Sequence, residues 1–179
     1  MDFVSDGKGR EQDIIDLFAA SFTAAEGAAE GTLIAALVRD LLEGTPAGDL
    51  HVFLACEGLT IIGGAIFSRM RYDRDARRVF ILSPMAVAPD RQGQGVGQAL
   101  LRHALAVLRA DGVAVALTYG DPDFYGRVGF AQISVAQAAA PFALRQPEGW
   151  LGQSLTDAPL APLKGPAACV AALNNPDLW

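Results

Sequence analysis

The sequence predicts an α/β fold, with a mixed, mostly antiparallel sheet flanked by helices. Three observations support this prediction. Two stretches, at 14–22 and 33–42, carry apolar residues at helical spacing, and three apolar runs joined by short turns fill residues 51–87. A glycine-rich loop, a helix and another strand then follow in order. The three runs predict an antiparallel meander, and the elements after them predict a crossover that joins two parallel strands.

The first two predicted helices are amphipathic. In each of them apolar residues recur every three or four positions and so form one face. These residues are Ile14, Ile15, Phe18 and Phe22 in the first helix and Leu33, Ile34, Leu37, Val38, Leu41 and Leu42 in the second. Gly27 separates the two helices, and a stretch rich in glycine at 44–48 ends the second one.

Three strands are predicted to follow the helices. The first, at 51–56, is short and mostly apolar, and the second, at 60–71, comes after a tight turn. Gly63 and Gly64 loosen this second strand, because glycine has no side chain to pack. A charged turn returns the chain into the third strand, at 77–87. Strands joined in this way pair with their neighbours as an antiparallel meander.

The crossover follows the third strand. Its helix is predicted from six apolar residues at helical spacing, namely Val96, Leu100, Leu101, Ala104, Leu105 and Leu108. Asp111-Gly112 ends the helix, and the apolar run at 113–118 is typical of a fully buried strand. Because a helix connects them, the strands at 77–87 and 113–118 are expected to be parallel.

The last part of the chain is less regular. Asp121 is expected to cap a short helix that has Pro122 at its first position and that ends at Gly129. A strand at 130–135 follows. Beyond residue 140 the chain is rich in Pro, Gly and Ala, and it predicts only one more strand, near 167–171.

Length and composition predict a single domain over residues 1–179, since 51% of the residues are hydrophobic and form a sizeable core. The net charge of −6 provides no positive field for phosphate backbones, which argues against nucleic acid as a partner. The N-terminus lacks the cationic and apolar segments of a secretory signal, and no uncharged stretch is long enough to cross a bilayer comfortably. We therefore expect a cytoplasmic protein that does not bind membranes.

The cysteines and histidines do not predict a metal site. Cys56, Cys169, His51 and His103 lie far apart and show no metal-ligand spacing. Both thiols are expected to be small buried side chains. His103 is expected on the solvated, polar side of its helix.

The loop Arg91-Gln92-Gly93-Gln94-Gly95-Val96-Gly97 carries the strongest functional signal. It joins the end of a strand to the start of a helix, where free backbone N–H groups and the helix dipole favour an anion. Glycines let the backbone approach a phosphate closely. The structural alternative is a flexible turn, but three alternate glycines beside an arginine exceed what a turn needs. The loop therefore predicts a phosphate-binding site.

The glycine spacing argues against two kinds of phosphate loop. A dinucleotide fingerprint needs Gly-x-Gly-x-x-Gly, yet Gln98 takes the third glycine position counted from Gly93, and Leu100 takes it counted from Gly95. The chain also contains no Gly-Lys-Ser/Thr triplet of a nucleoside-triphosphate loop. A nicotinamide-dependent oxidoreductase is kept as a rival that ligand binding would test.

The loop resembles that of the GNAT superfamily of acyl-CoA-dependent N-acyltransferases, which reads Gln/Arg-x-x-Gly-x-Gly/Ala. Here it is Gln92-x-x-Gly95-x-Gly97. Residues 82–89 resemble the central strand of that family, and residues 123–130 resemble its late Tyr and Gly-Phe signature. Gly120-Asp121-Pro122 and the stretch 176–179 are similar to the YhbS-like branch. The resemblance is good over about residues 50–130 and thin afterwards.

The resemblance implies a sheet whose two parallel strands, at 77–87 and 113–118, splay apart and admit the pantetheine of acetyl-CoA. It implies that acetyl-CoA is a co-substrate bound by backbone and side-chain groups of the central strand and the loop. The implied binding residues are Met85, Ala86, Val87, Arg91, Gln92, Gly93, Gln94, Gly95, Val96, Gly97 and Gln98. A backbone N–H near Met85 or Val87 would also stabilise the thioester oxyanion.

The implied reaction is transfer of an acetyl group to a primary amine by direct attack in a ternary complex. Tyr125 matches the general acid of the family, although a half-buried structural aromatic is the alternative reading. No general base stands out: His51, Glu57 and Ser83 are candidates, directly or through water, and each is also readily explained as structural. A catalytically inactive module that binds or senses acyl-CoA is therefore the alternative function.

The acceptor is expected to be a small-molecule amine, and the acidity of the chain mildly favours a cationic one. The sequence does not identify it further. A homodimer through a sheet edge or the C-terminal tail is also left open, with Trp150 and Trp179 as candidate anchors.

Overall fold

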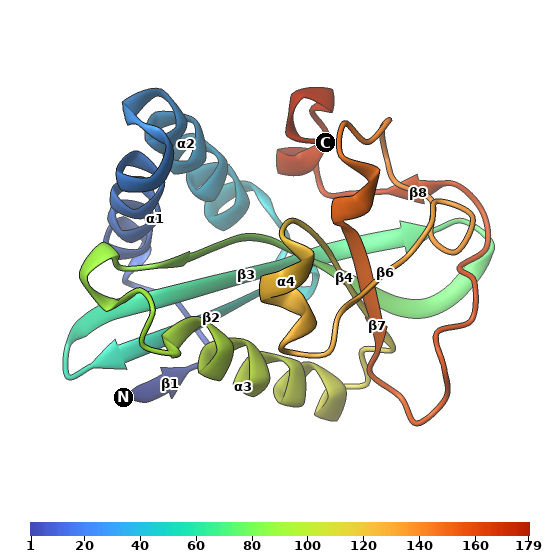
Figure 1. Ribbon diagram of the computed structural model, residues 1–179, viewed down its shortest axis with the longest axis horizontal. Coiled ribbons are helices and arrows are strands. Elements are labelled where there is room, and N and C mark those ends of the chain that lie inside the picture. Colours follow the sequence, from blue (N-terminus) through green and yellow to red (C-terminus); the bar gives the residue numbers. More distant parts are fainter. The chain divides into compact units, whose positions relative to one another are not determined.

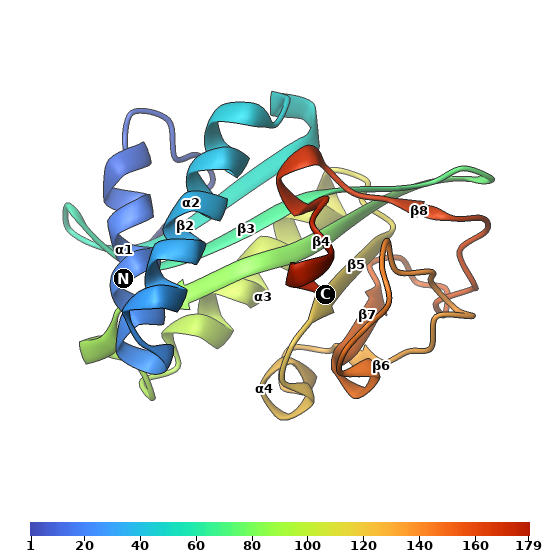
Figure 2. The same cartoon turned by 90° about the horizontal axis from the view of Figure 1, so that it is seen from above.

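The structure is a computed structural model that describes residues 1–179. Figure 1 shows the elements, and Figure 2 shows them from above. The helices are α1 (Glu11–Glu26), α2 (Ala28–Gly44), α3 (Val96–Ala110) and α4 (Pro122–Gly126). The strands are β1 (Asp2–Val4), β2 (Leu50–Glu57), β3 (Thr60–Tyr72), β4 (Asp75–Val87), β5 (Val115–Tyr119), β6 (Ala131–Gln132), β7 (Trp150–Ser154) and β8 (Ala167–Ala168).

The strands form a mixed sheet in the order β1-β2-β3-β4-β5-β7-β6, and β8 pairs with β3 outside this path. β4 and β5 are parallel, while β1 with β2, β3 with β8, and β7 with both β5 and β6 are antiparallel. The predicted fold class is therefore confirmed, as is the parallel pair created by the crossover through α3. No helix combines the length and the hydropathy that a membrane crossing requires.

The chain divides into two compact units that interleave along the sequence. Unit 1 consists of Met1–Phe67 and Pro84–Ala104, and unit 2 consists of Ser68–Ser83 and Leu105–Trp179. The strands β3 and β4 and the helix α3 each contribute residues to both units. A single domain over residues 1–179 stays a prediction.

In unit 1, α1 and α2 lie side by side, as both views show (Figures 1 and 2). Gly27 joins them with a φ of +100°, a conformation that residues with a side chain rarely adopt. The buried residues of α1 are Ile14, Ile15, Leu17, Phe18 and Ser21, which largely match the predicted face. In α2 the prediction was wrong for Leu33, which is 46% exposed.

Gly63 and Gly64 bring helices close to both faces of β3. A Cβ atom on Gly64 would lie 2.8 Å from Cε2 of Phe18, a residue of α1. A Cβ atom on Gly63 would lie 3.3 Å from Cγ1 of Val96, the first residue of α3. Consecutive residues of a strand point to opposite faces, so one glycine allows α1 to pack closely on one face and the other allows α3 to pack closely on the opposite face. The strand is not interrupted at this point, and its glycines mark close packing.

The strand β1 was not predicted, and its omission led to a second error. Asp2–Val4 pairs antiparallel with β2, with Phe3 opposite Ala55. The Phe3 ring stacks on His103, with centroids 4.8 Å apart, and Phe53 meets the same imidazole edge-on at 6.2 Å. His103 is therefore half-buried, and the prediction that it is solvated was wrong. Three residues are too few to show a strand period, so β1 could not be predicted from the sequence. The contact of Phe3 with His103 on α3 could therefore not be predicted either.

In unit 2, the parallel pairing of β4 with β5 runs from Val79 opposite Val115 to Leu82 opposite Thr118. β7 then pairs antiparallel with β5 over five positions, and this strand was missed. β6 is only Ala131–Gln132 where 130–135 was predicted, and β8 is only Ala167–Ala168 where 167–171 was predicted. β7 has the sequence Trp-Leu-Gly-Gln-Ser, which shows neither alternation nor an apolar run.

Trp150 and Trp179 belong to the core of unit 2. They are 0% and 4% exposed, and their rings meet at 6.0 Å beside Tyr119 of β5. Each indole N–H donates to a backbone carbonyl, of Ala138 and of Leu173 respectively. The prediction that they anchor a dimer was therefore wrong, because no aromatic surface is left for a partner.

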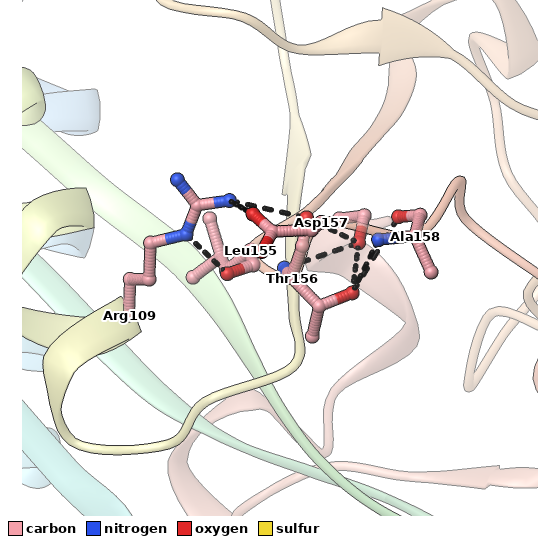
Figure 3. A network of polar contacts seen from close by, with 6 residues as sticks. Arg109, Leu155, Thr156, Asp157 and Ala158 are labelled. Atoms are coloured by element: carbon pink, nitrogen blue, oxygen red, sulfur yellow. Dashed lines mark hydrogen bonds and ion pairs between the residues drawn. The ribbon is translucent and has the colours of Figure 1, made fainter.

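The end of α3 is fixed to the segment that follows β7, also within unit 2. The Arg109 guanidinium donates to the carbonyl oxygens of Leu155, at 2.6 Å, and Thr156, at 3.1 Å (Figure 3). It also forms an exposed ion pair with Asp157. A cation at the C-terminal end of a helix also interacts favourably with the negative end of the helix dipole.

Both cysteines are free, with Cys56 buried and Cys169 half-buried.

Candidate functional site

The glycine loop connects β4 to α3 within unit 1 (Figure 1). The chain leaves β4 at Val87, makes a 3-10 turn at Pro89–Arg91, and enters α3 at Val96. Gly93 and Gly95 have φ values of +73° and +80°. A Cβ atom on either glycine would meet no atom within 4 Å. The loop therefore has a backbone that favours glycine, and open space lies beside it.

The first turn of α3 adds backbone donors to this loop. The N–H groups of the first turn of any helix have no acceptor within the helix, and the positive end of the dipole lies there. In α3 these are the groups of Val96, Gly97 and Gln98, and the turn contains no acidic residue. Gly97 is buried, whereas Gly93 and Gly95 are exposed. The stretch from Gly93 to Gln98 thus combines glycines at positive φ with the free N–H groups of a helix start.

The two glutamine side chains of the loop bond to its own backbone. Nε2 of Gln92 donates to the Val87 carbonyl oxygen at 3.1 Å, and Nε2 of Gln94 donates to the Asp90 carbonyl oxygen at 3.1 Å. In this arrangement both side chains stabilise the loop. The polar groups of the loop that remain are therefore chiefly backbone N–H groups.

Ser21 also takes part in this arrangement, and the sequence prediction missed it. Its hydroxyl donates to the same Val87 carbonyl oxygen, at 3.0 Å. Ser21 lies on α1 and is only 6% exposed. One feature of the sequence could have indicated this role. Ser21 lies three residues after Phe18, so its hydroxyl falls on the apolar face of the helix. A polar residue at such a position needs a partner, and here the partner is the end of β4.

Arg91, predicted beside the phosphates, is held by two carboxylates. Its guanidinium lies 3.2 Å from Oε2 of Glu57 and 2.7 Å from Oδ2 of Asp90. The hydrogen bond to Glu57 raises the pKa of Arg91, and the charges of Asp90 and Glu57 add to the rise. Glu57, a candidate base, is therefore engaged as the partner of a cation. Both residues belong to unit 1.

The other candidate residues of β4 and β2 lie as follows. Met85 and Val87 are half-buried and Ala86 is 5% exposed, as alternation along a strand requires. Ser83 is half-buried on β4. His51 is half-buried at the start of β2, with its ring 6.1 Å from that of Phe53.

Tyr125 lies on α4 in unit 2. This helix begins as the sequence predicts, but it ends at Gly126 and not at Gly129. The Asp121 carboxylate caps the helix by accepting from the Asp123 N–H at 2.9 Å, and Pro122 is the first helical residue. The Tyr125 ring meets Phe124 and Phe130 edge-on, at 5.0 and 5.8 Å. These contacts fix the ring at one orientation.

Gly120 lies directly under the Tyr125 ring. A Cβ atom on Gly120 would be 2.8 Å from Cε2 of that ring, which is closer than real contacts allow. The Gly120 N–H donates to the Gly149 carbonyl oxygen at 2.9 Å, so the backbone under the ring is itself held. The position of Tyr125 thus depends on the absence of a side chain at residue 120.

Burial raises the pKa of the Tyr125 hydroxyl. A hydrogen bond with the Thr118 side chain opposes the rise, and the charge of Asp121 adds to it. Thr118 is 1% exposed, and its hydroxyl donates to the Leu82 carbonyl oxygen at 3.1 Å, where the parallel pairing ends. A phenol with a raised pKa stays protonated at neutral pH.

Comparisons with known proteins agree on one family. The family model described as acetyltransferase (GNAT) domain matches residues 48–132. The uncharacterized N-acetyltransferase YjhQ of Escherichia coli strain K12 is 32% identical over 138 residues, which are 74% of this chain and 76% of that protein.

Two solved structures are similar over nearly the whole chain. The GNAT family N-acetyltransferase YhbS of Escherichia coli, in complex with CoA, is 25% identical with a TM-score of 0.75, and the match covers 97% of this chain and 91% of that one. A GNAT family acetyltransferase of Brucella melitensis, in complex with acetyl-CoA, is 25% identical with a TM-score of 0.69, and covers 96% of each chain.

Proposed function

This chain belongs to the GNAT family of acetyltransferases, and we propose on that premise that it transfers an acetyl group from acetyl-CoA to a primary amine of a small acceptor. The glycine loop at the start of α3 is the observation that carries the proposal. Its glycines adopt φ values of +73° and +80° beside open space, and the first turn of α3 adds backbone donors. The two similar solved structures bind CoA and acetyl-CoA, which supports the same co-substrate here.

In the proposed complex, backbone N–H groups from Gly93 to Gln98 bind the diphosphate of coenzyme A. The strand edge at Met85, Ala86 and Val87 binds the pantetheine arm as an added strand would. The Ala88 N–H already donates to the Ile62 carbonyl oxygen at 2.9 Å. The donor proposed for the thioester oxyanion is therefore the N–H of Met85 or of Val87.

The proposed reaction is a direct attack in a ternary complex. A neutral amine attacks the acetyl carbonyl carbon, the new C–N bond forms, and the C–S bond breaks as the thiolate leaves. Tyr125 donates its proton to the sulfur, and the proton lost by the amine goes to a base or to water. Among the candidate bases Glu57 is engaged by Arg91, which leaves His51, Ser83 or water for this role.

The same ion pair favours a second candidate function. If Glu57 is the only group near enough to act as a base, its engagement by Arg91 suits a module that binds or senses acyl-CoA without turning it over. The two functions share the cofactor and differ in the chemistry. An assay of turnover therefore separates them.

We expect free thiol to be released from acetyl-CoA when the protein is incubated with pools of small primary amines, and cationic amines to be the best acceptors. The net charge of −6 supports the second expectation, because it favours encounter with cations. Thiol release is followed with a thiol-reactive dye, against a control without amine.

Saturating acetyl-CoA should also stabilise the fold by about 2.7 kcal/mol at 100 times its Kd, and NAD should not. A stabilisation by acetyl-CoA without thiol release from any pool would favour the sensing module.

Replacing Gly120 with alanine is expected to lower kcat by about tenfold or more, because the new methyl group displaces the Tyr125 ring. The matched control is Gly126→Ala, since a Cβ atom on Gly126 meets nothing within 4 Å and the residue ends the same short helix. Both variants are compared by kcat and by the free energy of unfolding, where overpacking costs about 1–3 kcal/mol. Equal kcat values in the two variants would contradict the proposed role of the Tyr125 position.

A further inference from the structure

The peptide group between Val87 and Ala88 has all its hydrogen-bonding capacity in use. Its carbonyl oxygen, which has two lone pairs, accepts from Oγ of Ser21 at 3.0 Å and from Nε2 of Gln92 at 3.1 Å. Its N–H donates to the Ile62 carbonyl oxygen at 2.9 Å. All of these residues belong to unit 1. Helix α1, strand β3 and the glycine loop therefore meet at one peptide plane.

This peptide lies at the junction between two parts of the proposed cofactor site. The residues before it, Met85 to Val87, form the strand edge that is to bind the pantetheine arm. The residues after it lead through the turn at Pro89–Arg91 into the loop that is to bind the diphosphate. The orientation of this one peptide sets the direction in which the loop leaves the strand. A cofactor that engages both parts at once requires that direction to be fixed before it binds.

We propose that Ser21 and Gln92 are positioning residues, which hold the Val87–Ala88 peptide so that the glycine loop and the end of β4 bind one coenzyme A molecule together. This proposal rests on the proposed function. It assigns to Ser21, a residue of α1, a part in cofactor affinity, and it assigns to the Gln92 side chain a contact with the protein in place of a contact with phosphate.

The two bonds are redundant, and redundancy has a measurable signature. With either donor removed, the other still holds the carbonyl. With both removed, only the N–H bond to Ile62 remains, and the peptide is able to rotate. The loss of coenzyme A affinity in the double variant is therefore larger than the sum of the two single losses. Gln94 supplies the control, because its side chain bonds a different carbonyl, that of Asp90, in the same loop.

The test measures the Kd of coenzyme A by calorimetry for Ser21→Ala, Gln92→Ala, Gln94→Ala and the pairs Ser21→Ala/Gln92→Ala and Ser21→Ala/Gln94→Ala. We expect each single variant of Ser21 or Gln92 to weaken binding about two- to fivefold, and their pair to weaken it by about 50-fold or more. The pair with Gln94→Ala should show only the product of its single effects. Ser21→Thr, which keeps the hydroxyl, should restore affinity. Melting temperatures identify any variant that is not folded at the temperature of the titration.

Two results would overturn the proposal: additive losses in the Ser21 and Gln92 pair, or an unchanged Kd in that pair. Ser21→Ala is a small change in the middle of a helix, so it is expected to leave a folded protein for the titration. If the unaltered protein does not bind coenzyme A at all, the proposed function fails. If it binds and no coupling is found, only the role of Ser21 and Gln92 fails.

Discussion

Replacing Tyr125 with phenylalanine is expected to lower kcat by about 10²- to 10³-fold, with the Kd of acetyl-CoA nearly unchanged. The variant keeps the ring that packs against Phe124 and Phe130 and loses only the hydroxyl that is to protonate the sulfur. Burial raises the pKa of this hydroxyl above its ordinary value of 10.0, so the acid form persists as the pH rises. Activity that depends on it should therefore be retained through neutral and mildly alkaline pH.

The matched control for this experiment is Tyr72→Phe. Tyr72 is buried, and its hydroxyl donates to the Ala139 carbonyl oxygen at 2.7 Å, a bond with no part in the proposed chemistry. Its loss should lower the free energy of unfolding by about 1 kcal/mol and leave kcat unchanged. Unaltered turnover in Tyr125→Phe would show that Tyr125 is not the general acid.

Replacing Gly95 with valine is expected to raise the Kd of coenzyme A by more than about 100-fold. Gly95 has a φ of +80°, where a β-branched residue is strained, and the valine side chain would fill the open space that the diphosphate is to occupy. Because no protein atom lies within 4 Å of the new Cβ, the fold should survive the change.

Gly9→Val is the control for the backbone strain. Gly9 has a φ of +81°, and a Cβ atom on it would also meet nothing within 4 Å. Both variants should lose similar stability, about 1–2 kcal/mol, while only Gly95→Val loses coenzyme A. Calorimetric titration and thermal unfolding of the two variants give this comparison. Wild-type affinity in Gly95→Val would contradict the assignment of the phosphate loop.

The elements that the sequence predicted well are those with a long or strongly punctuated signal. The apolar stripe from Val96 to Leu108 predicted α3, and Asp121 followed by Pro122 predicted α4, because caps and periodicity are local properties. The parallel pairing of β4 with β5 followed from the connection through a helix. These elements can be predicted without knowing which residues pack against them.

The features that escaped prediction depend on contacts between distant residues. His103 is half-buried because β1 covers it, and a three-residue strand has no period to detect. Gly63 and Gly64 mark a strand that helices approach closely, and glycine alone does not reveal which neighbour requires it. Trp150 and Trp179 lie in the core of unit 2. The sequence alone does not show whether a tryptophan packs into a core or against a partner chain.

The candidate site divides in the same way. The loop from Arg91 to Gly97 could be predicted, because its glycine spacing has a backbone cause. The hydrogen bonds of Ser21 and Gln92 to Val87, and the ion pair of Arg91 with Glu57, could not be predicted. They join residues that are far apart in the chain or that have several equally good partners.

A crystal structure of the protein with coenzyme A bound tests the proposed cofactor site most directly. We expect the diphosphate oxygens within hydrogen-bonding distance of the backbone N–H groups between Gly93 and Gln98, with the pantetheine along Met85 to Val87. A diphosphate bound elsewhere on the chain, or a loop that stays empty at saturating coenzyme A, would contradict it.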